Sequence, residues 1–167
     1  MVKPSFSLTE QAIEKLVKCV PDAPVEEIKL VRLLHSVGYV LDYGFCQYLK
    51  PLDLNQSEWL TLLFIFSEEK KYFAPSELAK SLNCSRTNAT RLIESLRKRA
   101  FVQSAANSSD RRKIQVSLST AGRTFVEQHL PDQFNHVKKQ FNDIFSSEEM
   151  AQLHLLNMKI LRYFERN

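Results

Sequence analysis

Apolar residues recur every three or four positions through most of the 167-residue chain, and this spacing predicts helices. The pattern in 25–49 is wider than a surface stripe, so burial on more than one side is expected there. Gly38 and Gly44 within it indicate close approach of a neighbour. Pro131 is expected to bend a second long helix, 120–145. Further helices are expected at 8–20, from 54 through 66, on either side of 83–85, and after 146–147.

The pair of short helical patterns around 83–85 has the form of a helix-turn-helix. Its first helix carries an apolar face at Leu78, Ala79 and Leu82, and Ala89 opens the stripe of the second. In the turn, an asparagine tolerates the left-handed conformation and Ser85 is a suitable N-cap. In such a motif the second helix lies in the DNA major groove.

Side chains that can read base edges occupy the outward face of that second helix. Arginine pairs with guanine and asparagine with adenine, and here both types stand within two turns. The alternative is a solvated basic face on an ordinary surface helix. The outward residues are Arg86, Thr87, Asn88, Thr90 and Arg91.

A β-hairpin with a basic tip is predicted directly after this helix. The segments 101–105 and 114–118 have strand character, and 114–118 alternates apolar and polar residues. The polar loop between them, 106–113, ends in three basic residues. Such a finger suits the negative potential of the minor groove. The fold class is therefore mainly α with a small β-hairpin wing, a winged helix-turn-helix.

The positive charge of the chain is concentrated in this region. Residues 75–113 carry nine Lys/Arg and three Asp/Glu, whereas the remainder carries fourteen Lys/Arg and sixteen Asp/Glu. An excess of +6 against −2 is the electrostatic footprint expected of a DNA-binding region.

Three runs within 75–131 resemble the multiple-antibiotic-resistance regulator (MarR) family, closest to its EmrR/MprA branch of multidrug-efflux repressors. They are 85–91, Asp110-Arg111-Arg112, and Leu118-Ser119-Thr120-Ala121-Gly122. By this resemblance Arg112 enters the minor groove and Asp110 orients it. Family members usually have glycine at position 100, so the alanine there implies a differently built helix exit. The expected DNA-binding set is Pro75, Ser76, Ser85, Arg86, Thr87, Asn88, Thr90, Arg91, Asp110, Arg111, Arg112 and Lys113.

The terminal helices are expected to form a dimer interface. One domain of this size cannot cover their apolar faces, so two subunits would share them. A homodimer also has the two-fold symmetry that a pseudo-palindromic operator in double-stranded DNA requires. The expected organisation is 1–53 and 120–167 for dimerisation, with 54–119 as the DNA-binding domain.

A small-molecule effector is implied by the resemblance. Aromatic residues are dense in the first two long helices, although plain core packing accounts for many of them. The EmrR branch implies a pocket for lipophilic, often phenolic, compounds, and release of a repressor by such a ligand. The expected lining residues are His35, Tyr39 and Trp59.

Alternative functions rest on weaker signals. No phosphate-binding glycine loop is seen, so neither a catalytic site nor a cofactor is expected. His129 and His136 could share a helix face, but no third metal ligand accompanies them, and no metal is expected. Cys46 is interpreted as a buried core residue, with a redox-sensing thiol in a regulator of the same fold as the alternative. A metal-responsive regulator is the weaker alternative. Without a signal peptide or membrane span, the expected location is cytoplasmic.

Overall fold

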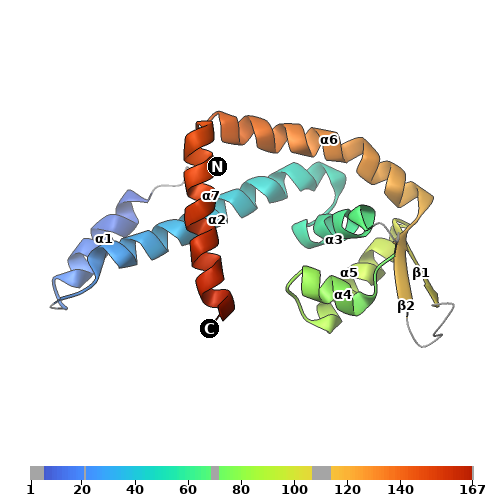
Figure 1. Ribbon diagram of the computed structural model, residues 1–167, viewed down its shortest axis with the longest axis horizontal. Coiled ribbons are helices and arrows are strands. Elements are labelled where there is room, and N and C mark those ends of the chain that lie inside the picture. Colours follow the sequence, from blue (N-terminus) through green and yellow to red (C-terminus); the bar gives the residue numbers. More distant parts are fainter. Residues whose placement is uncertain (1–5, 21, 69–71, 107–113, 167) are drawn as a thin grey trace. The chain divides into compact units, whose positions relative to one another are not determined.

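The computed structural model describes residues 6–20, 22–68, 72–106 and 114–166 (Figure 1). It is mainly helical with one antiparallel hairpin, which confirms the predicted fold class. The chain divides into two compact units, Met1–Thr61 and Leu62–Asn167. The elements are α1 (Ser7–Val17), α2 (Val25–Leu49), the 3₁₀ turn η1 (Lys50–Leu52), α3 (Gln56–Ser67), α4 (Pro75–Ser81), α5 (Arg86–Lys98), β1 (Val102–Ala106), β2 (Ile114–Leu118), α6 (Thr120–Asn142) and α7 (Ser147–Arg166).

In the first unit, the N-terminal helix α1 packs on α2. Ile13 is its buried residue, and the Glu14 carboxylate accepts a hydrogen bond from Lys29 Nζ at 3.2 Å. That hydrogen bond and the charge of Glu14 raise the pKa of Lys29. The contact fixes an 11-residue helix that is too short to be stable by itself in water.

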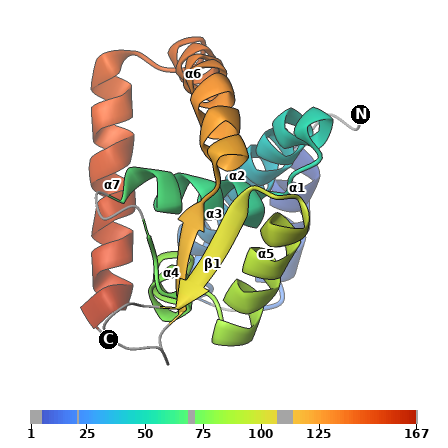
Figure 2. The same cartoon turned by 90° about the vertical axis from the view of Figure 1, so that its right-hand side faces the viewer.

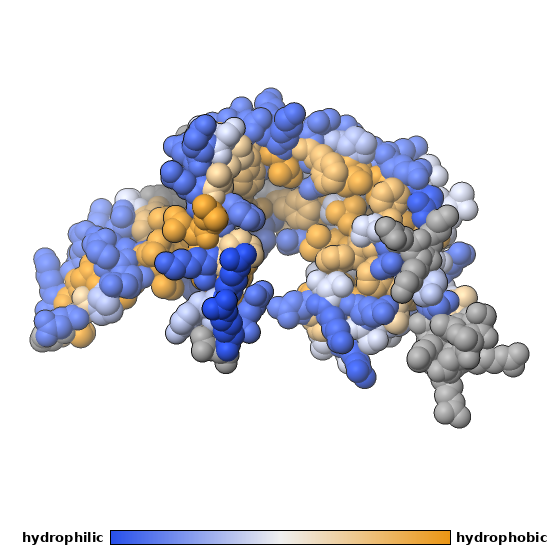
Figure 3. All heavy atoms as spheres, viewed as in Figure 1, coloured by the Kyte–Doolittle hydropathy of each residue, from blue (hydrophilic) through white to orange (hydrophobic). Residues whose placement is uncertain are grey.

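Helix α2 has the predicted bounds, but the expected burial on several sides is wrong for the single chain. Leu49 is the buried residue of the helix, whereas apolar and aromatic residues from Ile28 to Tyr43 are exposed. Figure 3 shows hydrophobic surface, coloured orange, on the face of the molecule that it draws. A side-chain Cβ placed at Gly38 or Gly44 would meet nothing within 4 Å. Close approach at these glycines therefore does not come from the described part of this chain.

Helix α3 begins with a reciprocal cap. The Asn55 side chain accepts from the Glu58 backbone N–H at 2.9 Å, and the Glu58 carboxylate accepts from the Asn55 N–H at 3.0 Å. This geometry satisfies two of the free donors at the helix start. Trp59, Leu62 and Ile65 are fully or almost fully buried, as the nearly all-apolar sequence predicts.

The second unit surrounds a small sheet beside α5 (Figure 2). Strands β1 and β2 pair from Val102 with Leu118 to Ala106 with Ile114. Phe73 adds an isolated bridge to Val116, with backbone hydrogen bonds of 2.7 and 2.8 Å. The core joins α4, α5, the hairpin and α6 through Leu78, Leu96, Val102, Val116 and Val126.

The exit from α5 corrects one expectation. Ala100 is left-handed, with φ of 58°, so it takes the conformation that a glycine would take there. The Ala100 N–H donates to the Arg97 carbonyl at 2.9 Å, and the Phe101 N–H donates to the Leu96 carbonyl at 3.0 Å. These two bonds form a Schellman motif. Alanine has not changed the geometry of the exit; it adopts this geometry at a cost.

Helices α6 and α7 leave much apolar surface on the single chain. The first continues through Pro131 and ends at Asn142, three residues before the predicted end. In α7, Ser146 and Glu149 form a capping box, with hydrogen bonds of 3.2 and 2.8 Å. No residue of α7 is buried; Leu156 is 62% exposed and Phe164 is 73% exposed.

Two further expectations concern the whole chain. Among the described residues, no helix is both long and apolar enough to cross a membrane. The expected segment boundaries at 53/54 and 119/120 stay predictions. The division of the chain into two compact units falls at 61/62 and does not test them.

Ala100→Gly should increase the free energy of unfolding by about 0.5–1 kcal/mol, because glycine adopts positive φ without steric cost. Denaturant-induced unfolding of both proteins measures this difference. Ala151→Gly is the matched control, since Ala151 is exposed within α7. That change should destabilise by up to about 1 kcal/mol. A destabilising effect of Ala100→Gly would show that the left-handed turn does not carry the expected strain.

Candidate nucleic-acid interface

The helix-turn-helix is built by α4, a tight turn and α5. Pro75 stands at the first position of α4, where the Glu77 carboxylate accepts from the Ala74 N–H at 2.8 Å. In the turn, Asn83 is left-handed with φ of 48°. Ser85 then caps α5, because its hydroxyl accepts from the Asn88 N–H at 3.2 Å. The roles predicted for the asparagine and for the Ser85 cap are both confirmed.

Small residues let α4 and α5 pack together. Ala79 and Ala89 are almost fully buried, as are Leu92 and Leu96 on the same face of α5. Because the apolar face of α5 is covered, its polar face is directed to solvent. Five of the predicted base readers are exposed there: Arg86, Thr87, Asn88, Thr90 and Arg91.

The five exposed side chains differ in what they can still offer to a ligand. The Thr90 hydroxyl donates to the Arg86 carbonyl at 2.9 Å, so its proton is already used. Thr90 is left with its methyl group and its acceptor lone pairs. In the part of the chain that the structure describes, the side chains of Asn88 and Arg91 have no hydrogen-bond or ion-pair partner. Both can therefore offer all their donors to DNA.

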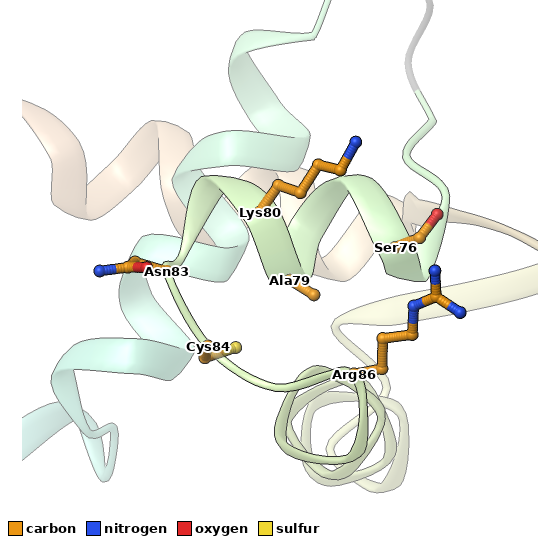
Figure 4. A pocket seen from close by; sticks show the side chains of 6 residues that line it. All are labelled: Ser76, Ala79, Lys80, Asn83, Cys84 and Arg86. Carbon is orange, nitrogen blue, oxygen red and sulfur yellow. The ribbon is translucent and has the colours of Figure 1, made fainter. Parts of the chain in front are cut away.

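An open cleft of about 320 Å³ lies between α4 and the start of α5 (Figure 4). The Arg86 side chain points across it toward Ser76, and the Cys84 sulfur points into it. Lys80, one turn after Ser76 on α4, brings a second cation. No acidic residue lines the cleft; its lining is Ser76, Ala79, Lys80, Asn83, Cys84 and Arg86.

This cleft suits a phosphate group better than a base. Its two cations have no carboxylate partner among the described residues, and the Ser76 hydroxyl is a hydrogen-bond donor. Sequence reasoning placed Ser76 and Arg86 in the DNA-binding set but missed Lys80. The signal was its position at i+4 from Ser76, which puts both on one face of α4.

The base of the predicted wing is present as β1 and β2. Its basic tip, Asp110 to Lys113, lies outside the described residues. The orienting role of Asp110 and the minor-groove role of Arg112 therefore stay predictions.

The three residues expected to bind an effector are in different environments. His35 is exposed and Tyr39 is 72% exposed, with its ring 6.5 Å from that of Tyr43. Trp59 has no exposed surface in the single chain. A ligand could reach Trp59 only after rearrangement, so the shared lining role stays a prediction.

Cysteine and histidine positions bear on the alternative functions. Cys46 is exposed, so its interpretation as a buried core residue is wrong for the single chain. The Cys84 thiol lies 3.5 Å from the Ser85 carbonyl. His129 packs on Phe125, with ring centroids 4.5 Å apart. Within the described ranges, no group of three potential ligands could hold a metal ion.

Known proteins are similar to this chain in sequence and in fold. The model of the MarR family matches residues 54–114. The transcriptional repressor MprA of Escherichia coli is 31% identical over 157 residues, which are 94% of this chain and 89% of MprA. A cysteine-to-serine mutant of E. coli MarR, solved with operator DNA, is 30% identical with a TM-score of 0.69, covering 84% and 99% of the two chains. The MarR-family regulator AbsC of Streptomyces coelicolor, at 20% identity and a TM-score of 0.75, has the same fold over 83% and 93%. The chain belongs to the MarR family.

Proposed function

We propose that this protein is a transcriptional repressor that binds a pseudo-palindromic operator as a homodimer and is released by a lipophilic ligand. One observation carries the DNA-binding part: α5 is capped and buried on one side, and presents unpaired Asn88 and Arg91 on the other. The relatives named above, a repressor and a regulator solved with operator DNA, support the assignment.

The proposed DNA contacts are of two kinds: contacts to base edges and contacts to the phosphates of the DNA backbone. Asn88 and Arg91 point to solvent from the first two turns of α5, the part of a recognition helix that contacts base edges. Arg86 instead extends over the cleft toward α4, the helix that carries Lys80 (Figure 4). Phosphate contacts of this kind position a protein on DNA without reading its sequence.

The homodimer is supported by apolar surface that the single chain leaves uncovered. Exposed apolar side chains follow α2, the second half of α6, and α7 from Leu153 to Phe164. So many exposed apolar side chains are unusual for a monomer and indicate an interaction surface. The two long helices and α7 would then supply the interface, and the two recognition helices would be related by a two-fold axis.

Release by a lipophilic compound rests on the resemblance to the MprA branch and on the aromatic side chains of α2. A ligand acts in this way only if it binds the DNA-free state more tightly than the DNA-bound state. The thiol-sensing alternative has the exposed Cys46 in its favour. A sensor thiol also needs a nearby base, and Lys50, four residues later, is the local candidate.

Selection of bound genomic fragments tests the function as a whole. We expect a pseudo-palindromic consensus, with an affinity that falls steeply as salt rises because phosphate contacts release counterions. Phenolic lipophilic compounds should then weaken operator binding, as measured by fluorescence anisotropy. Selection of no consensus would exclude a sequence-specific repressor, and binding unaffected by any such compound would exclude only the proposed effector.

Substitutions on α5 should separate base readers from the phosphate anchor. Asn88→Ala and Arg91→Ala should each cost about 1–3 kcal/mol on the selected operator and little on random DNA. Arg86→Ala and Lys80→Ala should weaken both DNAs alike and reduce the salt slope by about one each. Unfolding temperatures of all variants serve as the control for the helix itself. Equal losses on both DNAs for Arg91→Ala would contradict its role in base reading.

Charges on α7 should disrupt the dimer without disturbing the fold of the chain. Leu156→Glu combined with Phe164→Glu places two charges on side chains that are largely exposed in one subunit. Light scattering should then show monomers where the parent protein shows dimers, with unchanged helix content by circular dichroism. Arg162→Glu, on the opposite face of the helix and also exposed, is the control. A double variant that remains dimeric would place the interface elsewhere.

A further inference from the structure

The motif Leu118–Gly122 joins the wing to α6, and the DNA-reading face described above gives it no role. Its serine contacts the end of the recognition helix α5 directly. The Ser119 hydroxyl donates to the Ala100 carbonyl at 2.6 Å, and the Ser119 N–H donates to the Phe101 carbonyl at 3.0 Å. The same hydroxyl oxygen accepts from the Gly122 N–H at 2.9 Å, so it also caps α6.

At Gly122, the first turn of α6 contacts the backbone of Phe101, just after the end of α5. A Cβ on Gly122 would overlap the Phe101 carbonyl oxygen and lie 2.8 Å from its carbon. Because the obstacle is backbone, no side-chain movement can relieve it. Only glycine allows α6 to approach the exit of the recognition helix so closely.

Aromatic packing extends the contact along α6. The Phe101 and Phe125 ring centroids are 4.6 Å apart, within the range of favourable aromatic pairs. Phe125 packs in turn on His129, and the Arg99 guanidinium lies 5.0 Å from the centre of the Phe101 ring. Side chains from the last turn of α5 to the third turn of α6 are thus in continuous contact.

We propose that Ser119, Gly122 and Phe125 are positioning residues that fix the recognition helix to α6, and thereby set the half-site spacing that the protein accepts. We refer to them, with Ala100 and Phe101, as the α5–α6 junction. The inference rests on the proposed homodimer, in which α6 contributes to the interface. Hydrogen bonds, a close backbone approach and ring packing together leave the recognition helix little freedom to turn relative to α6.

A rigid junction has a measurable consequence on DNA. One base pair added between half-sites moves them apart by about 3.4 Å and rotates one by about 34°, since a turn of about 10–10.5 base pairs spans 34–36 Å. A dimer whose recognition helices cannot re-orient loses contacts in one half-site when the spacing changes. A dimer with a loosened junction can follow the displaced half-site.

The experiment measures affinities on a spacing series. The operator is selected with the parent protein, its spacer is changed by one or two base pairs either way, and affinities are measured by fluorescence anisotropy. The parent should lose more than about tenfold per added base pair, and Ser119→Ala less than about threefold. Ser119→Asp separates two roles, because aspartate still caps α6 but has no proton to donate to Ala100.

Two variants serve as controls. Ser119→Thr keeps the hydroxyl and should keep the parent's spacing preference. Thr120→Ala removes the adjacent exposed hydroxyl, which has no hydrogen-bond partner among the described residues, and should change nothing. The negative charge of Ser119→Asp weakens binding at every spacing alike, so the ratio between spacings is unaffected by it.

Flattened spacing preference in Ser119→Ala and Ser119→Asp, but not in the controls, supports the inference. Equal losses at all spacings would overturn it, because a merely destabilised protein loses active fraction without changing preference. If Ser119→Ala does not fold, Phe125→Leu decides in the same way. Failure of the parent to select any operator would contradict the proposed function, whereas flat preference in the parent itself would contradict only the rigid junction.

Discussion

The carbonyl groups of Ala100 and Phe101 are the point on which the second unit depends. They end the recognition helix, they precede β1, and they bind the residue that starts α6. A single left-handed residue reverses the chain there. Three elements meet at these two adjacent carbonyls. The orientations of the recognition helix, the wing and α6 therefore depend on one another.

The reading face follows from burial on the opposite side of α5. Ala89, Leu92 and Leu96 commit one side of the helix to the core, so the polar side faces solvent. The Ser85 cap fixes where the helix starts, and hence which residues lie in its first turn. The cations on this face have no carboxylate partners among the described residues. Their charge is therefore available to an anionic ligand such as the DNA backbone.

The long helices α2, α6 and α7 have in common that much of their apolar surface is exposed in the single chain. Long helices with broad apolar faces form readily, but a single copy has too few elements to cover them. Burial of such surface at roughly 25 cal/mol per Å² stabilises a dimer strongly. We therefore interpret the uncovered apolar faces of α2, α6 and α7 as surface that a second subunit covers.

The sequence by itself determined the elements with local causes. Periodicity placed α2 at its observed bounds, and the cap at Ser85 marked a helix start, because these effects act within one or two turns. The order of helix-turn-helix and hairpin followed from the same local patterns. Local patterns also carried the resemblance that the comparisons confirmed.

Only the tertiary structure decided which residues meet across the sequence. Position 100 was predicted to change the exit of α5, but contacts to Ser119 and Gly122, about twenty residues later, accompany a glycine-like conformation on an alanine. Lys80 joined the cleft because α4 packs beside the start of α5. Burial of α2 and of Cys46 was predicted wrongly because composition shows that a surface is apolar, not which neighbour covers it. Such contacts depend on the packing of distant segments, which periodicity and capping do not encode.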